Sequence, residues 1–199
     1  MHAIWTILSI LFSYLLGAVP FGLLFTRIFS KIDVRTVGSG NIGATNVLRA
    51  AGKKAAILTL LADALKGLIP VLIVAALFHD DTMTILAGAA AILGHNFPVY
   101  LKFKGGKGVA TSYGVVLGTS PWIGLICLLI WLLAAFLWRY SSLAALVSFA
   151  FYPILTFLLN PASKPFAVLS LFIFGMIYYR HRENLKRLLA GTEQKIGKN

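Results

Sequence analysis

Three short polar segments interrupt an otherwise apolar chain, and they contain most of the side chains that could do chemistry. The first, VGSGNIGATNVLRA at 37–50, combines glycines with Ser39, Asn41 and Arg49. Glycines allow backbone N–H groups to approach an anion closely, and the polar side chains can complete its coordination. This segment predicts binding of an anion or another polar substrate. A flexible turn between two helices is the alternative interpretation.

The second segment, GHNFPVYLKFKGGKGVATS at 94–112, contains the run GGKG at 105–108 directly before an expected helix start. Free N–H groups at a helix start, the positive helix end and Lys107 together form a phosphate site without any nucleotide-binding fold. A solvated basic turn is the alternative. His95 lies at the inner end of the preceding apolar run, where it is either a structural residue or part of the site.

The third segment, YRHREN, begins the basic C-terminal tail. In a helix, His181 and Asn184 lie three residues apart and share a face, while Glu183 can pair with Arg180 or Arg187. The arginines can equally serve as anchors on the cytoplasmic side of a membrane.

Neither glycine-rich segment fits a nucleotide-binding motif. Gly38, Gly40 and Gly43 match G-x-G-x-x-G, but a dinucleotide site requires a preceding strand, and here an apolar helix precedes. A Walker A loop would need glycine at 101 and serine or threonine at 108, where the chain has Leu101 and Gly108.

Carboxylates are scarce, with 6 Asp and Glu residues against 18 Lys and Arg residues. This scarcity argues against two-carboxylate glycosidases and against transfer from ATP with carboxylate-held Mg²⁺. The acyltransferase dyad of histidine and an aspartate five residues later is absent, because Tyr100 follows His95 and Lys186 follows His181 at that spacing. We expect no metal and no other cofactor, and a cationic pocket that suits a phosphate substrate with an acyl chain.

The composition predicts an all-α polytopic membrane protein. Of 199 residues, 59% are hydrophobic and 12% are charged, whereas soluble domains are nearer half apolar and a quarter charged. The net charge of +12 could suggest a nucleic-acid partner, but no nucleic-acid-binding module is recognisable. Residues 1–199 are expected to form one membrane domain with the lipid bilayer as its surroundings, and the oligomeric state stays open.

Charge distribution favours seven membrane spans. Dividing the long apolar run at Ser120-Pro121 places 16 of the 18 Lys and Arg residues on one side, which predicts an outside N-terminus and a cytoplasmic C-terminus. Pro20 and Gly22 are expected to kink the first span. The predicted spans are 3–26, 55–78, 82–101, 109–119, 121–138, 141–159 and 165–180.

Two charged residues lie inside the second predicted span. Asp63 and Lys66 are three residues apart on one helix face, and charges in a span are costly unless paired or functional. A mutual structural pair and a part in an ion path are both consistent with this spacing. The lone Cys127 lies in an apolar run and predicts nothing about redox chemistry.

The three polar segments together resemble the signature blocks of the bacterial membrane glycerol-3-phosphate acyltransferase family that uses acyl phosphate. GSGNIGATNxxR at 38–49, GHNFPVYxxFKGGKGVAT at 94–111 and RHREN at 180–184 appear in the same order. DxxK in the second span and RYxS after the fifth add to the likeness, which extends along the whole chain.

The resemblance implies transfer of a fatty acyl group from acyl phosphate to the 1-hydroxyl of glycerol 3-phosphate. The products would be 1-acyl-glycerol 3-phosphate (lysophosphatidate) and phosphate, in the first acylation of phospholipid synthesis. It further implies seven helices in the bacterial inner membrane, with the site facing the cytoplasm and no use of acyl-CoA or acyl carrier protein.

Site roles follow from this expected reaction. The residues closest to the chemistry would be Ser39, Asn41, His95 and Lys107. The glycerol 3-phosphate clamp would comprise Arg49, Ser142, His181 and Asn184. The acyl-phosphate cradle would comprise Lys104, Gly105, Gly106, Gly108, Val109, Ala110 and Thr111.

The general base is not evident in the sequence. With no histidine–carboxylate pair at the dyad spacing, we favour direct transfer in which an oxygen of the acyl phosphate takes the hydroxyl proton. An acyl-enzyme on Ser39 is the alternative, although no base partner for it is evident. An anion transporter, another membrane lipid-phosphate transferase and a structural scaffold are the other functions considered. A transporter would need polar residues in more spans than the one that holds Asp63 and Lys66.

Overall fold

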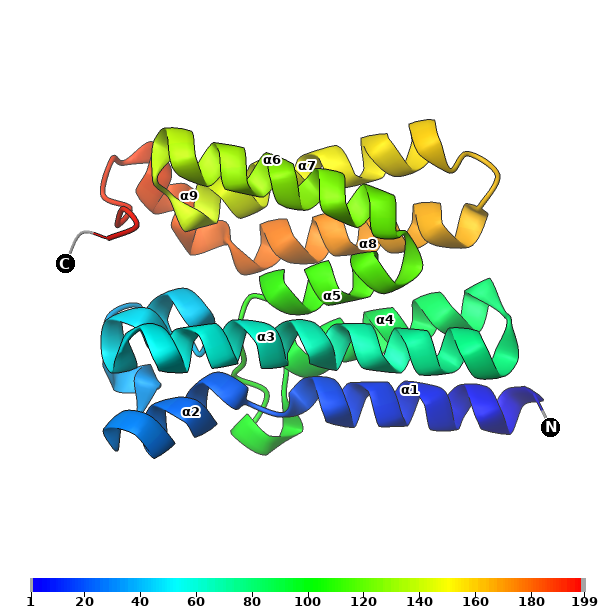
Figure 1. Cartoon of the computed structure of the whole chain (residues 1–199), viewed down its shortest axis with the longest axis horizontal. Coiled ribbons are helices and arrows are strands. Elements are labelled where there is room, and N and C mark those ends of the chain that lie inside the picture. Colours follow the sequence, from blue (N-terminus) through cyan, green and yellow to red (C-terminus); the bar gives the residue numbers. More distant parts are fainter. Residues whose placement is uncertain (1, 198–199) are drawn as a thin grey trace.

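The computed structural model describes residues 2–197, and all regular structure within them is helical. This confirms the predicted all-α class. The longer helices lie roughly parallel to one axis, with the N-terminus at one end and the C-terminal segment at the other (Figure 1).

Nine α-helices and two short 3₁₀ turns are found along the described residues. They are α1 His2–Ala18, α2 Phe21–Ser30, η1 Val34–Thr36, α3 Ala44–Phe78, α4 Asp81–Asn96, η2 Val99–Leu101, α5 Val109–Thr119, α6 Pro121–Trp138, α7 Ser141–Leu159, α8 Lys164–Arg180 and α9 Arg182–Leu189.

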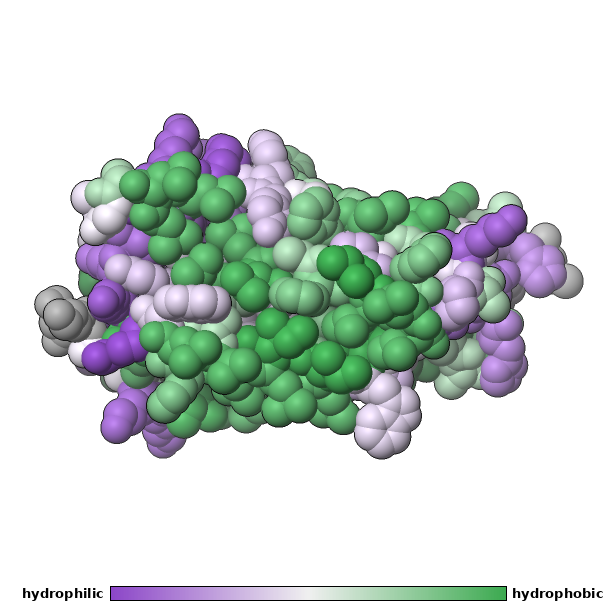
Figure 2. Space-filling model, turned by 90° about the horizontal axis from the view of Figure 1, so that it is seen from above, coloured by the Kyte–Doolittle hydropathy of each residue, from purple (hydrophilic) through white to green (hydrophobic). Residues whose placement is uncertain are grey.

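Five helical segments are long and apolar enough to cross a membrane by length and composition. They are His2–Ser30, Ala44–Phe78, Asp81–Leu101, Pro121–Trp138 and Ser141–Leu159. The other two expected spans correspond to α5, with 11 residues, and α8, with 17. The seven-span count and the orientation therefore stay predictions. On the face shown in Figure 2, apolar side chains cover most of the middle, and hydrophilic ones gather toward both ends.

Small residues face inward on α1, and large apolar ones face outward. Ser9, Ser13 and Gly17 are buried, while Ile7 and Leu11 are among the exposed residues. A Cβ atom added at Gly17 would overlap the backbone of α4, so the two helices approach each other closely. This arrangement is typical of membrane helices, which pack through small residues and expose apolar surface to lipid.

The short helix α5 lies between the α1–α4 half and the α6–α8 half of the bundle (Figure 1). It packs tightly on α3, because a Cβ atom at Gly114 would overlap the backbone at Ala64, and one at Gly118 would crowd Val71. The glycines at 114 and 118, four residues apart on one helix face, therefore allow this close helix packing.

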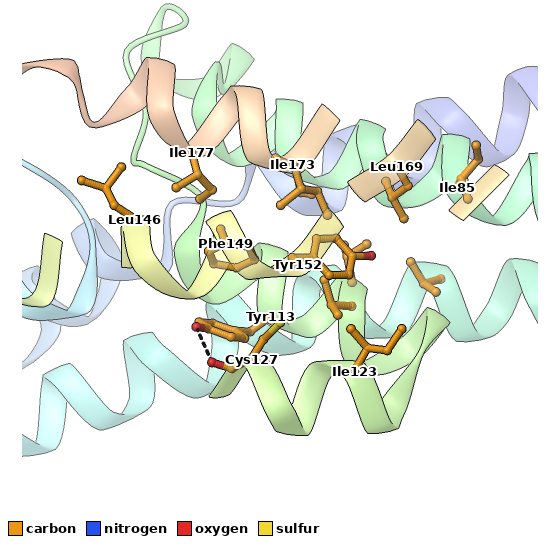
Figure 3. Close-up of a cluster of buried hydrophobic side chains, with 14 residues drawn as sticks. Ile85, Tyr113, Ile123, Cys127, Leu146, Phe149, Tyr152, Leu169, Ile173 and Ile177 are labelled. Carbon is orange, nitrogen blue, oxygen red and sulfur yellow. Dashed lines mark hydrogen bonds between the residues drawn. The ribbon is translucent and has the colours of Figure 1, made fainter. Parts of the chain in front are cut away.

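A buried apolar cluster joins α5, α6, α7 and α8 (Figure 3). The Tyr113 and Phe149 rings are in contact, tilted by 44° with 4.8 Å between their centroids, and the Tyr113 hydroxyl donates to the Cys127 carbonyl at 3.4 Å. The Ser148 hydroxyl also donates to that carbonyl, at 2.6 Å. The cluster therefore packs α5, α6, α7 and α8 against one another. Cys127 is a buried packing residue within it.

The first span is interrupted, as its proline and glycine predicted. Helix α1 ends at Ala18 and α2 begins at Phe21, since Pro20 lacks the N–H needed to continue the helix. Lys66 provides a hydrogen-bond partner for a carbonyl at the break. Its Nζ donates to the Val19 carbonyl at 2.8 Å and lies 2.7 Å from Asp63 Oδ1. Asp63 and Lys66 are thus a mutual buried pair that also anchors the break.

Two helices differ in extent from the predicted spans, which give only the membrane-crossing part. Helix α3 begins at Ala44, before the predicted span 55–78, and it bends at Gly52, whose φ of +79° is costly for other residues. Helix α4 ends at Asn96, because the residue before Pro98 is pushed out of helical conformation, and the apolar segment Asp81–Leu101 that continues beyond it matches the predicted span 82–101. The helix start at Ala44 brings part of the first polar segment into a helix N-terminus.

Candidate functional site

A cavity of about 690 Å³ opens at the end of the bundle where the three polar segments meet. It brings together eight polar residues that the sequence analysis selected: Ser39, Asn41, Arg49, His95, Lys107, Ser142, His181 and Asn184. Gly108, Val109 and Ala110 of the predicted cradle also line it. Residues more than 140 positions apart in the chain thus share one cavity wall.

Three helices begin in the cavity wall. The starts of α3 at Ala44, of α5 at Val109 and of α7 at Ser141 all contribute lining residues. Each helix N-terminus carries free N–H groups and a partial positive charge. The backbone alone therefore makes this cavity favourable for anions, before any side-chain charge is counted.

Asn46 organises the first polar segment from within. Its Nδ2 donates to the carbonyls of Val34, Val37 and Asn41 at 2.9–3.0 Å, and its Oδ1 accepts from the Ser39 N–H at 3.0 Å. The side chain is 2% exposed. Asn46 therefore holds Ser39 and Asn41 at the cavity, a role that the sequence analysis did not assign to it.

Lys107 joins the second polar segment to the third. Its Nζ donates to Asn184 Oδ1 at 2.6 Å. His181 lies beside Asn184 in the cavity wall, and its Nδ1 donates to the Ile177 carbonyl at 2.8 Å. Because a carbonyl can only accept, Nδ1 carries the proton, and in the neutral ring Nε2 is free to accept.

Glu193 is a site residue that the sequence analysis missed. Its Oε1 accepts from Ser142 Oγ and from Asn184 Nδ2, each at 2.6 Å, and its Oε2 accepts from Arg187 Nε at 2.7 Å. The tail that carries it returns to the bundle, where the Ile196 N–H donates to the Arg139 carbonyl at 2.6 Å. The only sequence signal was that Glu193 is one of two carboxylates, with Glu183, in a basic tail.

Burial and neighbouring polar groups shift the pKa values of three cavity residues. Burial lowers the pKa of Lys107 to about 8; Glu193 opposes the shift, and Arg187 adds to it. Burial and the charge of Lys107 lower the pKa of His181 to about 4. Burial disfavours ionised Glu193, but hydrogen bonds from Ser142, Asn184 and Arg187 outweigh it and lower its pKa.

His95 lies beneath the glycine run and faces a carboxylate. Its Nδ1 is 3.7 Å from Asp63 Oδ1, and its Nε2 lies where a Cβ atom on Gly106 would be. The absence of a histidine–carboxylate pair, assumed from spacing, is therefore wrong in three dimensions. The 3.7 Å separation is longer than a hydrogen bond, however, and Asp63 is already paired with Lys66.

Part of the predicted acyl-phosphate cradle lies outside the cavity wall. Lys104 is exposed on the loop after η2, and Gly105 and Gly106 pack behind the wall against His95. Thr111 is fully buried inside α5. The part of the cradle that reaches the cavity therefore consists of Lys107, Gly108, Val109 and Ala110.

One side of the cavity is apolar. Its wall includes Leu48, Ile57 and Leu60 on α3, and Trp131 on α6. Ile57 and Leu60 are also 56% and 50% exposed on the apolar surface, and α3 and α6 do not pack extensively against each other along the described residues. The polar chamber therefore continues into an apolar side opening. Within 2–197, no three His, Cys, Asp or Glu side chains are grouped so as to hold a metal ion.

Comparisons with known proteins give one consistent result. The family described as "Glycerol-3-phosphate acyltransferase" matches residues 7–191. A protein of that name from Mesorhizobium japonicum is 53% identical over 191 residues, which cover 96% of each chain. Its counterpart from Agrobacterium fabrum is 50% identical over 190 residues, which cover 96% of this chain and 91% of the relative.

The solved structures that resemble this chain have the same description as the sequence relatives. The crystal structure of PlsY, an integral membrane glycerol 3-phosphate acyltransferase, in its glycerol 3-phosphate form has a TM-score of 0.92 and 41% identity over 96% of both chains. Its lysophosphatidic acid form has a TM-score of 0.90 and 40% identity, covering 96% of this chain and 95% of the other.

Lys107 should make anion binding depend on pH. Its lowered pKa of about 8 means that the ammonium is present below that pH and lost above it. Inorganic phosphate only gains negative charge on the same rise, so weaker binding would report the lysine. We expect phosphate affinity to fall at least about threefold between pH 7 and pH 9, measured by calorimetry.

The matched control is Lys107→Arg, since a guanidinium stays charged over this range. This variant should keep its affinity up to pH 9. An equal decline in both proteins would contradict the assignment to Lys107.

Proposed function

Because the chain belongs to the glycerol-3-phosphate acyltransferase family, we propose that its cavity transfers a fatty acyl group from acyl phosphate to the 1-hydroxyl of glycerol 3-phosphate. The products are 1-acyl-glycerol 3-phosphate and inorganic phosphate. Family membership already identifies an integral membrane acyltransferase of phospholipid synthesis rather than a transporter or scaffold. The acyl-phosphate donor, the acylated position and the mechanism are the content of the proposal.

One contact supports the proposal above all. Lys107 Nζ lies 2.6 Å from Asn184 Oδ1, so the lysine of the cradle touches a residue of the clamp. A single ammonium between the two subsites can attract the phosphates of both substrates. It would thus hold the two reactants in one orientation, which can contribute several kcal/mol to lowering a bimolecular barrier.

The donor phosphate would bind at the start of α5. There the N–H groups of Val109 and Ala110, the positive helix end and Lys107 face the cavity. Phosphate is the leaving group of an acyl phosphate, and fixed positive dipoles stabilise the charge that develops on it during transfer.

The acceptor phosphate would bind to Arg49, Ser142, His181 and Asn184. Glu193 orients two of them by accepting from Ser142 and Asn184, although its own negative charge must be outweighed when a phosphate arrives. A bound dianion would favour protonated His181 and so raise its pKa, which would allow Nε2 to donate.

In the proposed reaction, Ser39 and Asn41 orient the acceptor hydroxyl or the donor carbonyl at the cavity mouth. The hydroxyl oxygen forms a bond to the acyl carbon, and the bond from that carbon to the phosphate oxygen breaks. The hydroxyl proton passes to an oxygen of the departing phosphate, so that no enzyme group must accept it. Transfer is direct, without an ester on Ser39.

His95 is the competing proton acceptor, since a carboxylate faces it. Two observations favour the substrate oxygen. Asp63 Oδ1 is 2.7 Å from Lys66 Nζ but 3.7 Å from His95 Nδ1, so its charge is largely matched by the lysine. His95 Nε2 also packs closely against Gly106, which limits the movement of the ring toward a substrate hydroxyl, although the residue lines the cavity.

The acyl chain would leave the polar chamber through the apolar side opening between α3 and α6. Leu60 and Ile57 line both the cavity and the apolar surface, so a chain there passes from the site into the bilayer without crossing polar groups. A substrate with a phosphate head and a lipid tail fits this combination of walls.

We further propose that the enzyme lies in the bacterial inner membrane with the cavity facing the cytoplasm. The cavity lies at the same end as most basic residues, and the positive-inside rule assigns that end to the cytoplasm. Seven spans with an outside N-terminus satisfy this orientation.

The donor is tested with purified protein. We expect product from acyl phosphate and glycerol 3-phosphate, and no more than about 1% of that rate from acyl-CoA, because the leaving group of a thioester is a thiolate rather than a phosphate that the α5 cradle can hold. Labelled acyl phosphate given alone should leave no ester on the protein. An ester on Ser39 would contradict direct transfer, and equal use of acyl-CoA would contradict the donor assignment.

Replacing His95 tests the base. If a substrate oxygen takes the proton, His95→Asn should reduce kcat by less than about 100-fold, below the range typical for loss of a general base. The pH dependence of kcat should keep its shape. A loss of about 10⁴-fold, together with disappearance of an acidic limb, would assign the proton to His95.

A tryptophan at the side opening tests the path of the acyl chain. Leu60→Trp should raise KM at least about fivefold for a sixteen-carbon acyl phosphate and much less for an eight-carbon one, because the ring obstructs only the outer part of the path. Leu61→Trp is the matched control, since Leu61 is 54% exposed but does not line the cavity. Equal effects of both variants would contradict this path.

A further inference from the structure

Arg180, the last residue of α8, donates hydrogen bonds to two carbonyls of the glycine run at 105–108. Its Nε donates to the Gly106 carbonyl at 2.9 Å, and its Nη2 donates to the Gly105 carbonyl at 2.8 Å. Its guanidinium also lies over the Phe97 ring, 5.2 Å from the centroid. Two donors of one rigid plane thus hold two consecutive carbonyls, which a flexible ammonium cannot reproduce.

The opposite side of the same turn is held as well. The Gly106 N–H donates to the His95 carbonyl at 3.1 Å, and the His95 ring occupies the space next to the Gly106 Cα. The glycine run therefore has backbone bonds on both sides and little freedom to rotate its peptide planes.

The direction of these bonds matters for an anion. In a trans peptide, the C=O of one residue and the N–H of the next point in opposite directions. The Gly105 carbonyl points to Arg180, and the Gly106 N–H accordingly points to His95. The Gly106 carbonyl also points to Arg180. The Lys107 N–H of the same peptide therefore points away from Arg180. Arg180 thus keeps two negative carbonyl ends away from a phosphate at the start of α5.

We propose that Arg180 is a positioning residue for the donor phosphate: it orients the Gly105–Gly106 peptides so that the Lys107 N–H and the start of α5 can receive the acyl phosphate. This rests on the proposed function of the cavity. Arg180 acts through the backbone of the cradle: its side chain donates to the Gly105 and Gly106 carbonyls and to none of the clamp residues.

The test compares two arginine-to-lysine variants in the full-length protein. Arg180→Lys keeps the positive charge but loses the two-point bond. Arg182→Lys is the matched control: Arg182 is two residues away, 54% exposed, and donates to the Tyr179 carbonyl at 3.2 Å. The Michaelis constants for both substrates and kcat are measured for each variant, with the thermal midpoint in detergent as a check on folding.

We expect Arg180→Lys to raise KM for acyl phosphate about tenfold, the effect of one lost charge-assisted hydrogen bond. KM for glycerol 3-phosphate should stay within about twofold, and Arg182→Lys should change neither constant. Equal increases in both constants, or a lowered thermal midpoint with unchanged constants, would show a general structural anchor and overturn the proposal. An unchanged acyl-phosphate KM in Arg180→Lys would overturn it too.

A second variant tests the proposal if Arg180→Lys folds poorly. Arg180→Ala is assayed at low acyl phosphate with and without millimolar ethylguanidinium, which can replace the missing fork. Partial recovery of the rate, with the wild-type enzyme unaffected, supports the proposal, and no recovery contradicts it. Wild-type activity with acyl phosphate is measured alongside, so that failure of the proposed donor is distinguished from failure of the role of Arg180.

Discussion

The structure is built around a cavity in which several positive groups lie close together and repel one another. Helices α3, α5 and α7 all run away from the same end of the bundle, so their positive N-termini meet in the cavity wall. Lys107 adds an ammonium at the centre. Burial, with the repulsion between these cations added to it, lowers the pKa values of Lys107 and His181. A bound phosphate would relieve the repulsion, which favours anion binding in this cavity.

Glu193 moderates this repulsion without removing it. Its carboxylate lies among Ser142, Asn184 and Arg187 and partly offsets the positive field at Lys107. Because it accepts hydrogen bonds from two clamp residues, it also fixes their orientation before substrate arrives. The C-terminal segment is therefore part of the site, although it lies beyond the last predicted span.

The buried pair Asp63 and Lys66 also contributes to the arrangement of the cavity wall. Lys66 pairs with Asp63 and satisfies the carbonyl left free at the α1–α2 break. His95 then lies between Asp63 and Gly106, and its ring supports the glycine run that Arg180 holds from the other side. Charges that suggested an ion path from sequence are thus explained by packing: in lipid, an interrupted helix needs an internal partner for its freed backbone groups.

The sequence by itself determined the all-helical class, most helix boundaries and eight polar residues of the cavity, because apolar runs, prolines and glycine-rich segments act locally. It did not show that α3 extends through Gly52 back to Ala44 or that α4 ends before Pro98, where the backbone preference of one residue decides. Only the tertiary structure revealed Glu193, the hub at Asn46, the Asp63–His95 pair and the placement of Lys104 outside the cavity. Each of these depends on which helices lie side by side and where a loop turns, and residue spacing along one chain carries no information about contacts between distant segments.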